Sequence, residues 1–204
     1  ITCANATATI HYTTDGTDPT AASAIYSGPI NVPNTMVVRA IAIGTNPPSF
    51  VETNTYLIDE SHSVPVVSVC SGDLFDLVAN GNQGPDDVGA FELFEQDGTF
   101  IDEGQGHFNK HGNDSWAYPQ RGFDFIMRDQ FGYNDDIDHL IFPADNDRTS
   151  FQRLILKPGA SDNYPFESGG AHIRDAFIHT LSIRADMLLD ERTWRPCVVY
   201  LNGQ

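Results

Sequence analysis

Hydrophobic and polar residues alternate in short runs along the first 58 residues of the chain. The runs "ATIHYTT", "MVVRAIAIG" and "VETNTYLI" are rich in β-branched residues, and turn signals such as Asp15-Gly16 separate them. Alternation with a period of two residues is typical of strands with one buried face, and these runs carry no helical periodicity. Residues 1–58 are therefore predicted to form short β-strands joined by turns.

The pattern changes from residue 64 onward. "VPVVSVC" is a continuous apolar run, typical of a strand buried on both faces, and "SGDLFDLV" after it has room for one or two helical turns. Four alternating runs predict further strands: "GAFELFE", "GHFNKHG", "RGFDFIMRDQFG" and "FQRLILKPG". The last run, "RPCVVYLNG", is predicted to be a strand that ends in an Asn-Gly turn.

A sustained helical stripe lies in residues 171–187, where five apolar side chains share one broad face: Ile173, Phe177, Ile178, Leu181 and Met187. This stripe predicts a helix packed on one side of a sheet. Residues 64–204 are thus expected to be a mostly antiparallel sheet with one packed helix, joined to the first region by a linker at residues 59–63. The predicted class is mainly β / α+β, with a separate core in each region.

Charge excludes some partners. The 204 residues include 28 Asp and Glu against 11 Lys and Arg, for a net charge of −17. Such a surface repels nucleic acid and anionic lipid, so neither is an expected partner. The sequence contains no run of 18 apolar residues, and direct membrane insertion is not expected either.

Three cysteines, Cys3, Cys70 and Cys197, lie far apart and form no CxxC pair. Their spacing argues against a zinc ribbon or a thioredoxin-like site. They are interpreted as small buried hydrophobes, with one internal disulfide as the alternative.

Excess carboxylates also supply candidate ligands for a hard cation such as Ca²⁺. Two Asp-rich segments stand close in the sequence and are the best metal candidates: Asp135, Asp136 and Asp138, then Asp145 and Asp147. The alternative is that these aspartates form solvated loops. No GxSxG, HExxH or Walker motif is present to indicate another chemistry.

Two resemblances follow from longer stretches. "IHYTTDGTDPT", "YSGPI" and "VRAIAIG" resemble the β-sandwich module at the C-terminus of chitobiase and β-hexosaminidase. Residues 64–204 resemble the N-terminal part of the CotH kinase-like family, named for a spore-coat protein H, through "PVVSV", "FELFEQDGTF", "GHFNKHGNDSWAYPQRGFDF", "RLILKPG", "HIRDAF" and "RPCVVYLNGQ" in the family's order. Together they imply a bacterial protein that is extracellular or at the cell surface.

The first resemblance implies a hairpin at the opening turn, in which Asp15 and Asp18 cap turns by accepting hydrogen bonds from nearby backbone N–H groups. A calcium role for this pair is the alternative. The proteins in which this module occurs also imply a carbohydrate-binding role. Trp116 and Tyr118 are the candidate aromatic platform for it.

The second resemblance implies an atypical protein kinase that uses ATP and Mg²⁺. In that family the segment matching "YPQRGFDF" carries a Lys that approaches the nucleotide, and Arg121 stands at its position here. The family's catalytic and metal-binding aspartates lie beyond the segment that matches "VVYLNGQ". No catalytic residue is therefore assigned in this chain, and Arg121 is a candidate for half of a nucleotide site; a surface Arg at a strand end is the alternative.

Three functions remain open. The first is a non-catalytic structural or adhesive segment of a secreted or cell-surface protein, the second is the nucleotide-binding half of a CotH-type kinase, and the third is a carbohydrate-binding accessory module. Both ends of the chain are expected to leave sheet edges bare. Flanking parts of a longer parent chain or strands from neighbouring copies are expected to cover them, which implies self-assembly.

Overall fold

A small sheet carries the start of the chain. The computed structural model describes residues 1–44, 47–80, 87–144, 146–159, 162 and 169–204. The small sheet has the order β2-β1-β3-β4, and its paired strands are all antiparallel. Its strands are β1 (Thr9–Thr13), β2 (Ala24–Ile25), β3 (Met36–Ile43) and β4 (Glu52–Tyr56).

A six-stranded sheet follows, in the order β11-β8-β7-β6-β5-β12. Neighbouring strands are antiparallel except for β12, which is parallel to β5. Its strands are β5 (Val66–Ser71), β6 (Asp87–Phe94), β7 (Phe100–His111), β8 (Gly122–Met127), β11 (Arg153–Leu156) and β12 (Val198–Leu201). A two-stranded pair, β9 (Ile137–Asp138) and β10 (Ser150–Phe151), lies beside it.

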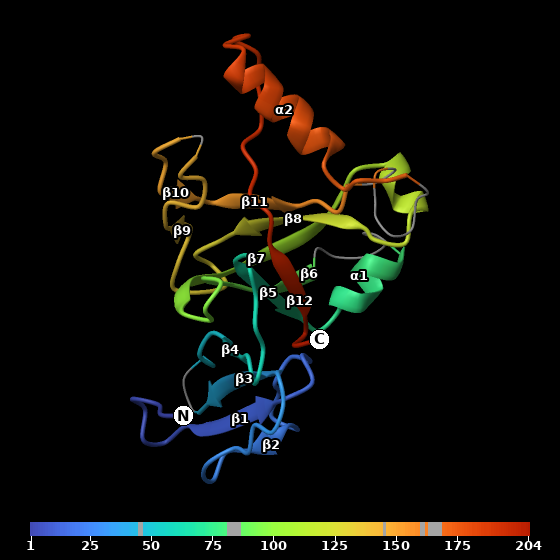
Figure 1. Cartoon of the computed structure of the whole chain (residues 1–204). Helices are drawn as coiled ribbons and strands as arrows, with labels where there is room; N and C mark the ends of the chain where they lie inside the picture. Colours follow the sequence, from blue (N-terminus) through green and yellow to red (C-terminus); the bar gives the residue numbers. More distant parts are fainter. Residues whose placement is uncertain (45–46, 81–86, 145, 160–161, 163–168) are drawn as a thin grey trace.

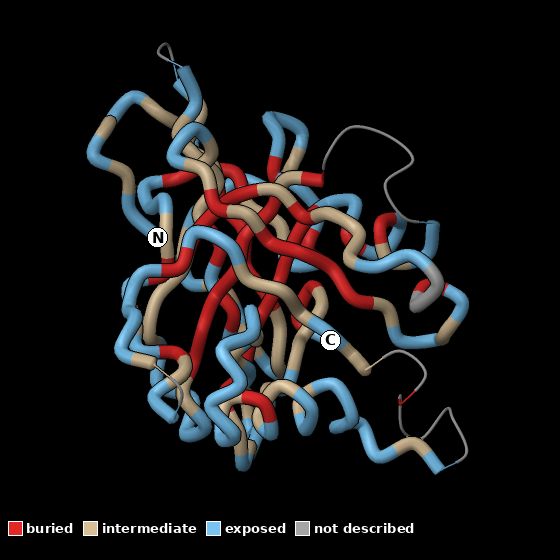
Figure 2. The backbone as a smooth tube through the Cα atoms, turned by 90° about the horizontal axis from the view of Figure 1, so that it is seen from above, coloured by how far each residue is buried: buried red, intermediate tan, exposed pale blue. Residues whose placement is uncertain are grey.

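The apolar core lies on one face of the six-stranded sheet. Phe91, Phe108 and Phe125 are almost fully buried, and the ring of Phe125 lies 5.3 Å from Phe91 and 4.6 Å from Phe108, centre to centre. Helix α1 (Leu74–Asn80) covers this core with the buried side chains of Leu74 and Leu77. Figure 2 shows that the buried segments follow the central strands.

Strand β5 is buried along its whole length because each of its faces meets a different layer. Val67 and Val69 point into the apolar core, whereas Ser68 and Cys70 contact the small sheet. The described structure confirms the predicted mainly β / α+β class, with an antiparallel small sheet and a mixed six-stranded sheet. The four-stranded sheet has its layer partner in the six-stranded sheet, with residues 59–63 between β4 and β5 (Figure 1).

The packed helix is not the one that the apolar stripe indicated. Helix α2 (Arg174–Arg184) forms within residues 171–187, but Figure 1 shows it standing outside the sheets. The stripe is exposed to solvent, with Phe177 58% and Leu181 51% accessible. Helix α1, for which the sequence showed room for one or two turns, is the helix that packs on the core. No helix among the described residues has both the length and the apolar character needed to cross a membrane.

A short 3-10 helix, η1 (Asp114–Ala117), lies between β7 and β8, and Asp162 contacts the chain where helix α2 begins. The Asp162 carboxylate accepts hydrogen bonds from the backbone N–H groups of Ala171, Ile173 and Arg174, at distances of 2.6 to 2.8 Å. These bonds, the one from Arg174 first, lower the pKa of Asp162. The carboxylate therefore fixes the chain where it enters α2.

Candidate functional site

The two sheets meet through a polar contact that we call the seam. It comprises Arg39 on β3, Thr55 on β4, Ser68 and Cys70 on β5, and Glu92 on β6. All five residues are buried, and Glu92 is only 2% exposed. Polar side chains are rare between packed sheets unless they are hydrogen-bonded, so the bonds of the seam decide its stability.

Glu92 forms one end of the seam. Its Oε1 accepts a hydrogen bond from the backbone N–H of Thr55 at 3.0 Å, and its Oε2 lies 2.5 Å from the Thr55 hydroxyl. That hydroxyl is also 2.7 Å from the hydroxyl of Ser68. Thr55 thus joins the edge strand of the small sheet to two strands of the large one.

Burial raises the pKa of the Glu92 carboxyl to about 7, although the hydrogen bonds from Thr55 act in the opposite direction. Glu103, directly across from Glu92 on β7, adds like-charge repulsion. The pKa of Glu103 is itself raised, first by burial and then by the neighbouring charges of Glu52 and Asp102. This end of the seam is therefore a row of carboxyl groups that resist ionisation.

Arg39 forms the other end. Its guanidinium is almost fully buried and donates to the carbonyl of Gly16 at 3.0 Å, to the hydroxyl of Thr53 at 3.4 Å, and to the carboxylate of Asp18. The Cys70 thiol also lies 3.7 Å from the Gly16 carbonyl. Three elements distant in sequence therefore meet at one turn.

Gly16 occupies that turn because no larger residue fits. Its φ is +84°, and a Cβ added there would lie 2.4 Å from the Asn202 side chain. Asn202 in turn exchanges hydrogen bonds with both backbone groups of Ser71, at 3.0 Å each. The Asp15-Gly16 turn of the opening segment is thus inserted against the end of the large sheet.

A second buried carboxyl lies close to this end. Asp87 accepts a hydrogen bond from the Ser71 hydroxyl, and burial raises the pKa of Asp87 to about 6. The charges of Asp73 and Asp18 raise it further, while Arg39 lowers it.

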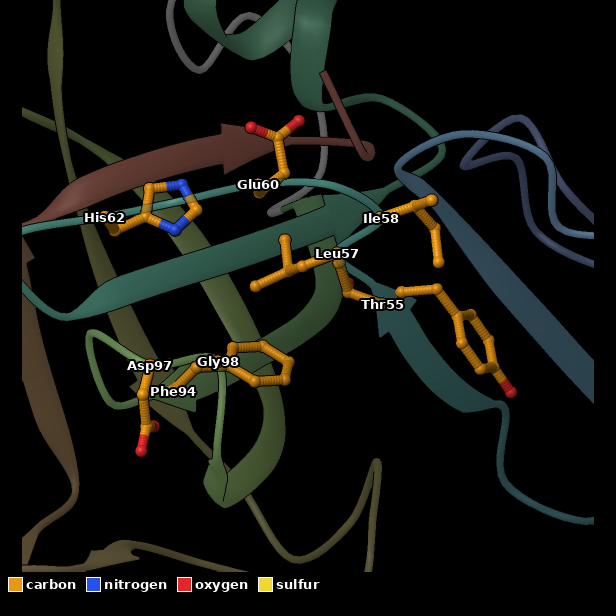
Figure 3. A pocket seen from close by; sticks show the side chains of 9 residues that line it. Thr55, Leu57, Ile58, Glu60, His62, Phe94, Asp97 and Gly98 are labelled. Carbon is orange, nitrogen blue, oxygen red and sulfur yellow. The ribbon is translucent and has the colours of Figure 1, made fainter.

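A pocket of about 260 Å³ opens where the linker leaves β4. Figure 3 shows Glu60 and His62 on one side of it and Phe94, Asp97 and Gly98 on the other. The polar groups are engaged with the chain: Glu60 accepts from the Thr35 hydroxyl at 3.0 Å, and His62 Nε2 lies 3.0 Å from the Tyr200 hydroxyl. The linker is therefore tied to both sheets.

Arg121 lies at the end of helix α1. Its guanidinium donates to the carbonyl of Val78 at 2.7 Å and to that of Ala79, and it lies 5.2 Å from the centre of the Trp116 ring. Carbonyls at a helix C-terminus lack intrahelical partners, and a cation there satisfies them. These contacts are those of a residue that caps the C-terminus of a helix.

The two residues of the proposed aromatic platform, Trp116 and Tyr118, differ in burial. Trp116 is 9% exposed, and its indole Nε1 donates to the carbonyl of His111 at 2.9 Å. Lys110 lies 5.0 Å from its ring centre. Tyr118 is half-buried. Trp116 is therefore a packed anchor, which corrects the expectation of an exposed ring at this position.

Strand β9 pairs with β10 and places Asp138, from the first Asp-rich segment, opposite Ser150. Asp136 accepts a hydrogen bond from the Ser150 hydroxyl, and Asp135, Asp138 and Asp147 are exposed. Asp145 lies outside the described residues. Within the described part of the chain, no three His, Cys, Asp or Glu side chains are grouped to hold a metal ion.

The aspartates of the opening segment have different roles. Asp15 accepts from the backbone N–H of Thr17 at 3.1 Å and from its hydroxyl at 2.6 Å, and these bonds lower the pKa of Asp15. Its predicted capping role is confirmed. Asp18 pairs with Arg39 instead of capping a turn. The three cysteines are free, and Cys70 is the one that is fully buried.

Sequence reasoning did not identify the seam. Arg39 stands inside the apolar run "MVVRAIAI" and Glu92 inside "AFELF", so each breaks a hydrophobic pattern with a charge. That interruption is a usable signal, because a charge on a buried strand needs a specific partner. It does not identify the partner, which comes from another sheet.

The comparisons with known proteins concern the first sheet. Residues 1–53 match the family model of the chitobiase/beta-hexosaminidase C-terminal domain. The match covers β1 to β3 and the start of β4, including the Asp15-Gly16 turn and Arg39. No curated protein and no solved structure gives a significant match to the chain. The resemblance of residues 64–204 to the CotH kinase-like family receives no support from these comparisons.

Proposed function

We propose that the chain is a non-catalytic structural unit of a secreted or cell-surface protein, in which a chitobiase C-terminal-type sheet serves as a support docked on a second sheet. The seam is the observation that supports this proposal. It uses the face of the small sheet that carries Arg39, Thr53 and Thr55 for contact within the chain. The small sheet uses this face to contact the six-stranded sheet, and it can therefore serve as a support for that sheet. The CotH-like resemblance contributes the proposed location.

The seam predicts that both sheets unfold together. Replacing Thr55 by Val removes the hydroxyl that joins Glu92 to Ser68, which is expected to lower the free energy of unfolding by about 1–3 kcal/mol. Hydrogen exchange measured by mass spectrometry through a urea series should show residues 1–58 and 66–127 losing protection at the same concentration. Thr7→Val, at an exposed site, is the matched control. Two separate transitions in the wild-type protein would contradict a docked support.

We also propose that the unit assembles through its sheet edges. Strands β11 and β12 are the outer strands of the six-stranded sheet in the described part of the chain. Outer strands present unpaired N–H and C=O groups that accept further strands. Flanking residues of a longer chain or neighbouring copies would supply them. Sedimentation of residues 1–204 is expected to show oligomers, and a monodisperse, thermally stable monomer would contradict this part of the proposal.

Carbohydrate binding is the second candidate, and the family match favours it. A depression of about 520 Å³ on the matched sheet is lined by residues that include Tyr12, Asp15 and Ser23. A tyrosine ring and a carboxylate are groups that bind sugar hydroxyls and faces. Titration with chitin oligosaccharides tests this candidate, with Tyr12→Ala expected to abolish any heat of binding.

A further inference from the structure

We propose that the seam is a pH-sensitive latch, in which the neutral carboxyl of Glu92 holds β4 against the large sheet and its ionisation loosens the small sheet. This inference rests on the proposed function, because it assigns a control to the contact that makes the small sheet a support. It concerns a group that the family match does not cover, since the match ends at residue 53.

The geometry places Glu92 where a change of charge acts on the contact itself. The carboxyl touches Thr55 on β4 directly, and Thr55 is the residue that joins the two sheets. The backbone N–H of Thr55 donates directly to the Glu92 carboxyl. A change at one carboxyl thus alters the hold on the edge strand of the small sheet.

Glu103 and the Cys70 thiol interact with Glu92 itself, and the charges of Glu52 and Asp102 act on Glu103. Asp102 and Glu103 lie on β7, Glu52 on β4, Cys70 on β5 and Arg39 on β3. Arg39 is engaged with Asp18 and the Gly16 turn. Among the residues that the structure describes, Glu92 has no ion pair, and the charge that acts on its pKa is that of Glu103.

The neutral form fits this environment better than the anion. A protonated Glu92 donates to the Thr55 hydroxyl, which then donates to Ser68, and no charge is left between the sheets. An ionised Glu92 keeps both bonds from Thr55 but places an anion in a dry contact beside Glu103. Burial of an anion without a cation is unfavourable, and the contact with the small sheet is what buries it.

The direction of the pH effect follows from the pKa. Burial raises the pKa of Glu92 from 4.5 to about 7. The stabilisation of the closed seam is therefore present at acid pH and is lost as the pH rises through 7. Each unit of difference corresponds to a tenfold change in the opening equilibrium, so complete ionisation increases opening by up to about 300-fold.

The experiment is amide hydrogen exchange of the whole chain between about pH 5.5 and pH 8.5, with rates corrected for intrinsic base catalysis. The readout is protection of the Thr55 amide, whose partner is Glu92. It is expected to fall at least tenfold across this range, with a midpoint near 7. Glu92→Gln, a neutral replacement, is expected to flatten the response, whereas Asp129→Asn removes an exposed charge and should leave it unchanged.

A second measurement does not depend on the folding of a variant. Carbon NMR of the wild-type carboxyls is expected to show Glu92 titrating near pH 7, and Glu103→Gln is expected to lower that midpoint by removing a like charge. A Glu92 midpoint below about 5, or an unchanged pH response in Glu92→Gln, would overturn the latch. Constant Thr55 protection with both sheets unfolding together would overturn the latch alone. Separate unfolding of the two sheets at every pH would overturn the proposed function as well.

Discussion

At the scale of single residues, the described structure depends on polar side chains that satisfy groups far away in the sequence. Arg39 is the clearest case, because its guanidinium joins β3 to the Asp15-Gly16 turn and to Asp18. Asp162 plays a comparable part where the chain enters α2. The Arg39 guanidinium and the Asp162 carboxylate are themselves buried, so each depends on its hydrogen bonds within the chain.

Replacing Arg39 by Met tests this view. The change removes the guanidinium donor to the Gly16 carbonyl and leaves the weaker Cys70 thiol donor at 3.7 Å, while Asp18 is 59% exposed and regains water. We therefore expect the free energy of unfolding to fall by about 1–3 kcal/mol, measured by urea denaturation. Arg192→Met, at an exposed position, should change it by less than about 0.5 kcal/mol. Equal effects of the two replacements would show that burial of Arg39 is unimportant.

Arg121 has two interpretations, as a residue that caps helix α1 or as part of a nucleotide site, and replacing it distinguishes them. If it ends helix α1, Arg121→Ala is expected to lower the free energy of unfolding by about 1–2 kcal/mol, and no micromolar binding of Mg-ATP is expected in either protein. Calorimetry with Mg-ATP and denaturation of both proteins check the two statements. A micromolar dissociation constant that Arg121→Ala abolishes would favour the nucleotide-binding alternative.

At the scale of elements, the two helices contrast. Leu77 on α1 is 4% exposed and belongs to the core, whereas Leu181 on α2 is 51% exposed. Leu77→Ala is expected to reduce the free energy of unfolding by about 2–5 kcal/mol, since it leaves a cavity. The same change at Leu181 should cost less than about 1 kcal/mol. Urea denaturation of both variants checks this, and a large loss at Leu181 would mean that the α2 stripe is buried in solution.

At the scale of the whole molecule, lowered and raised pKa values make the free energy of unfolding decrease at both low and high pH. The pKa values of Asp15 and Asp162 are lowered by hydrogen bonds, so their contribution is present above about pH 4 and is lost as the pH falls. Burial raises the pKa values of Asp87 to about 6 and of Glu92 to about 7, so their contribution is lost as the pH rises through these values.

The free energy of unfolding is therefore expected to reach its maximum at about pH 4 to 4.5, where the carboxyls of the unfolded chain begin to ionise, and to fall as the pH rises to about 7. Repulsion within a chain of net charge −17 weakens stability further at higher pH, and added salt should recover part of that loss. Urea denaturation across this range, repeated at high salt, measures both effects. A maximum above about pH 7.5 would contradict the raised pKa values.

Much of the fold was predictable from the sequence, because strands depend on local alternation. The runs predicted as strands contain β1, β3, β4, β5 and most of the large sheet, and the Asp15 turn was predicted with its capping role. The helix in residues 171–187 was also predicted correctly as a helix. Periodicity reports which side chains share a face, and local hydrogen bonding closes turns, so neither needs information from distant residues.

What the sequence by itself determined is thus the type of most of the longer elements, the excess of acidic charge and the match of residues 1–53 to a known domain. The tertiary structure decided which apolar stripe is buried, so that α1 packs and α2 does not. It also decided that Glu92 faces Thr55, 37 residues earlier, and that Arg121 ends α1. The physical reason is that burial and the pKa of a carboxyl depend on which surfaces meet, and side-chain spacing within one element does not contain that information.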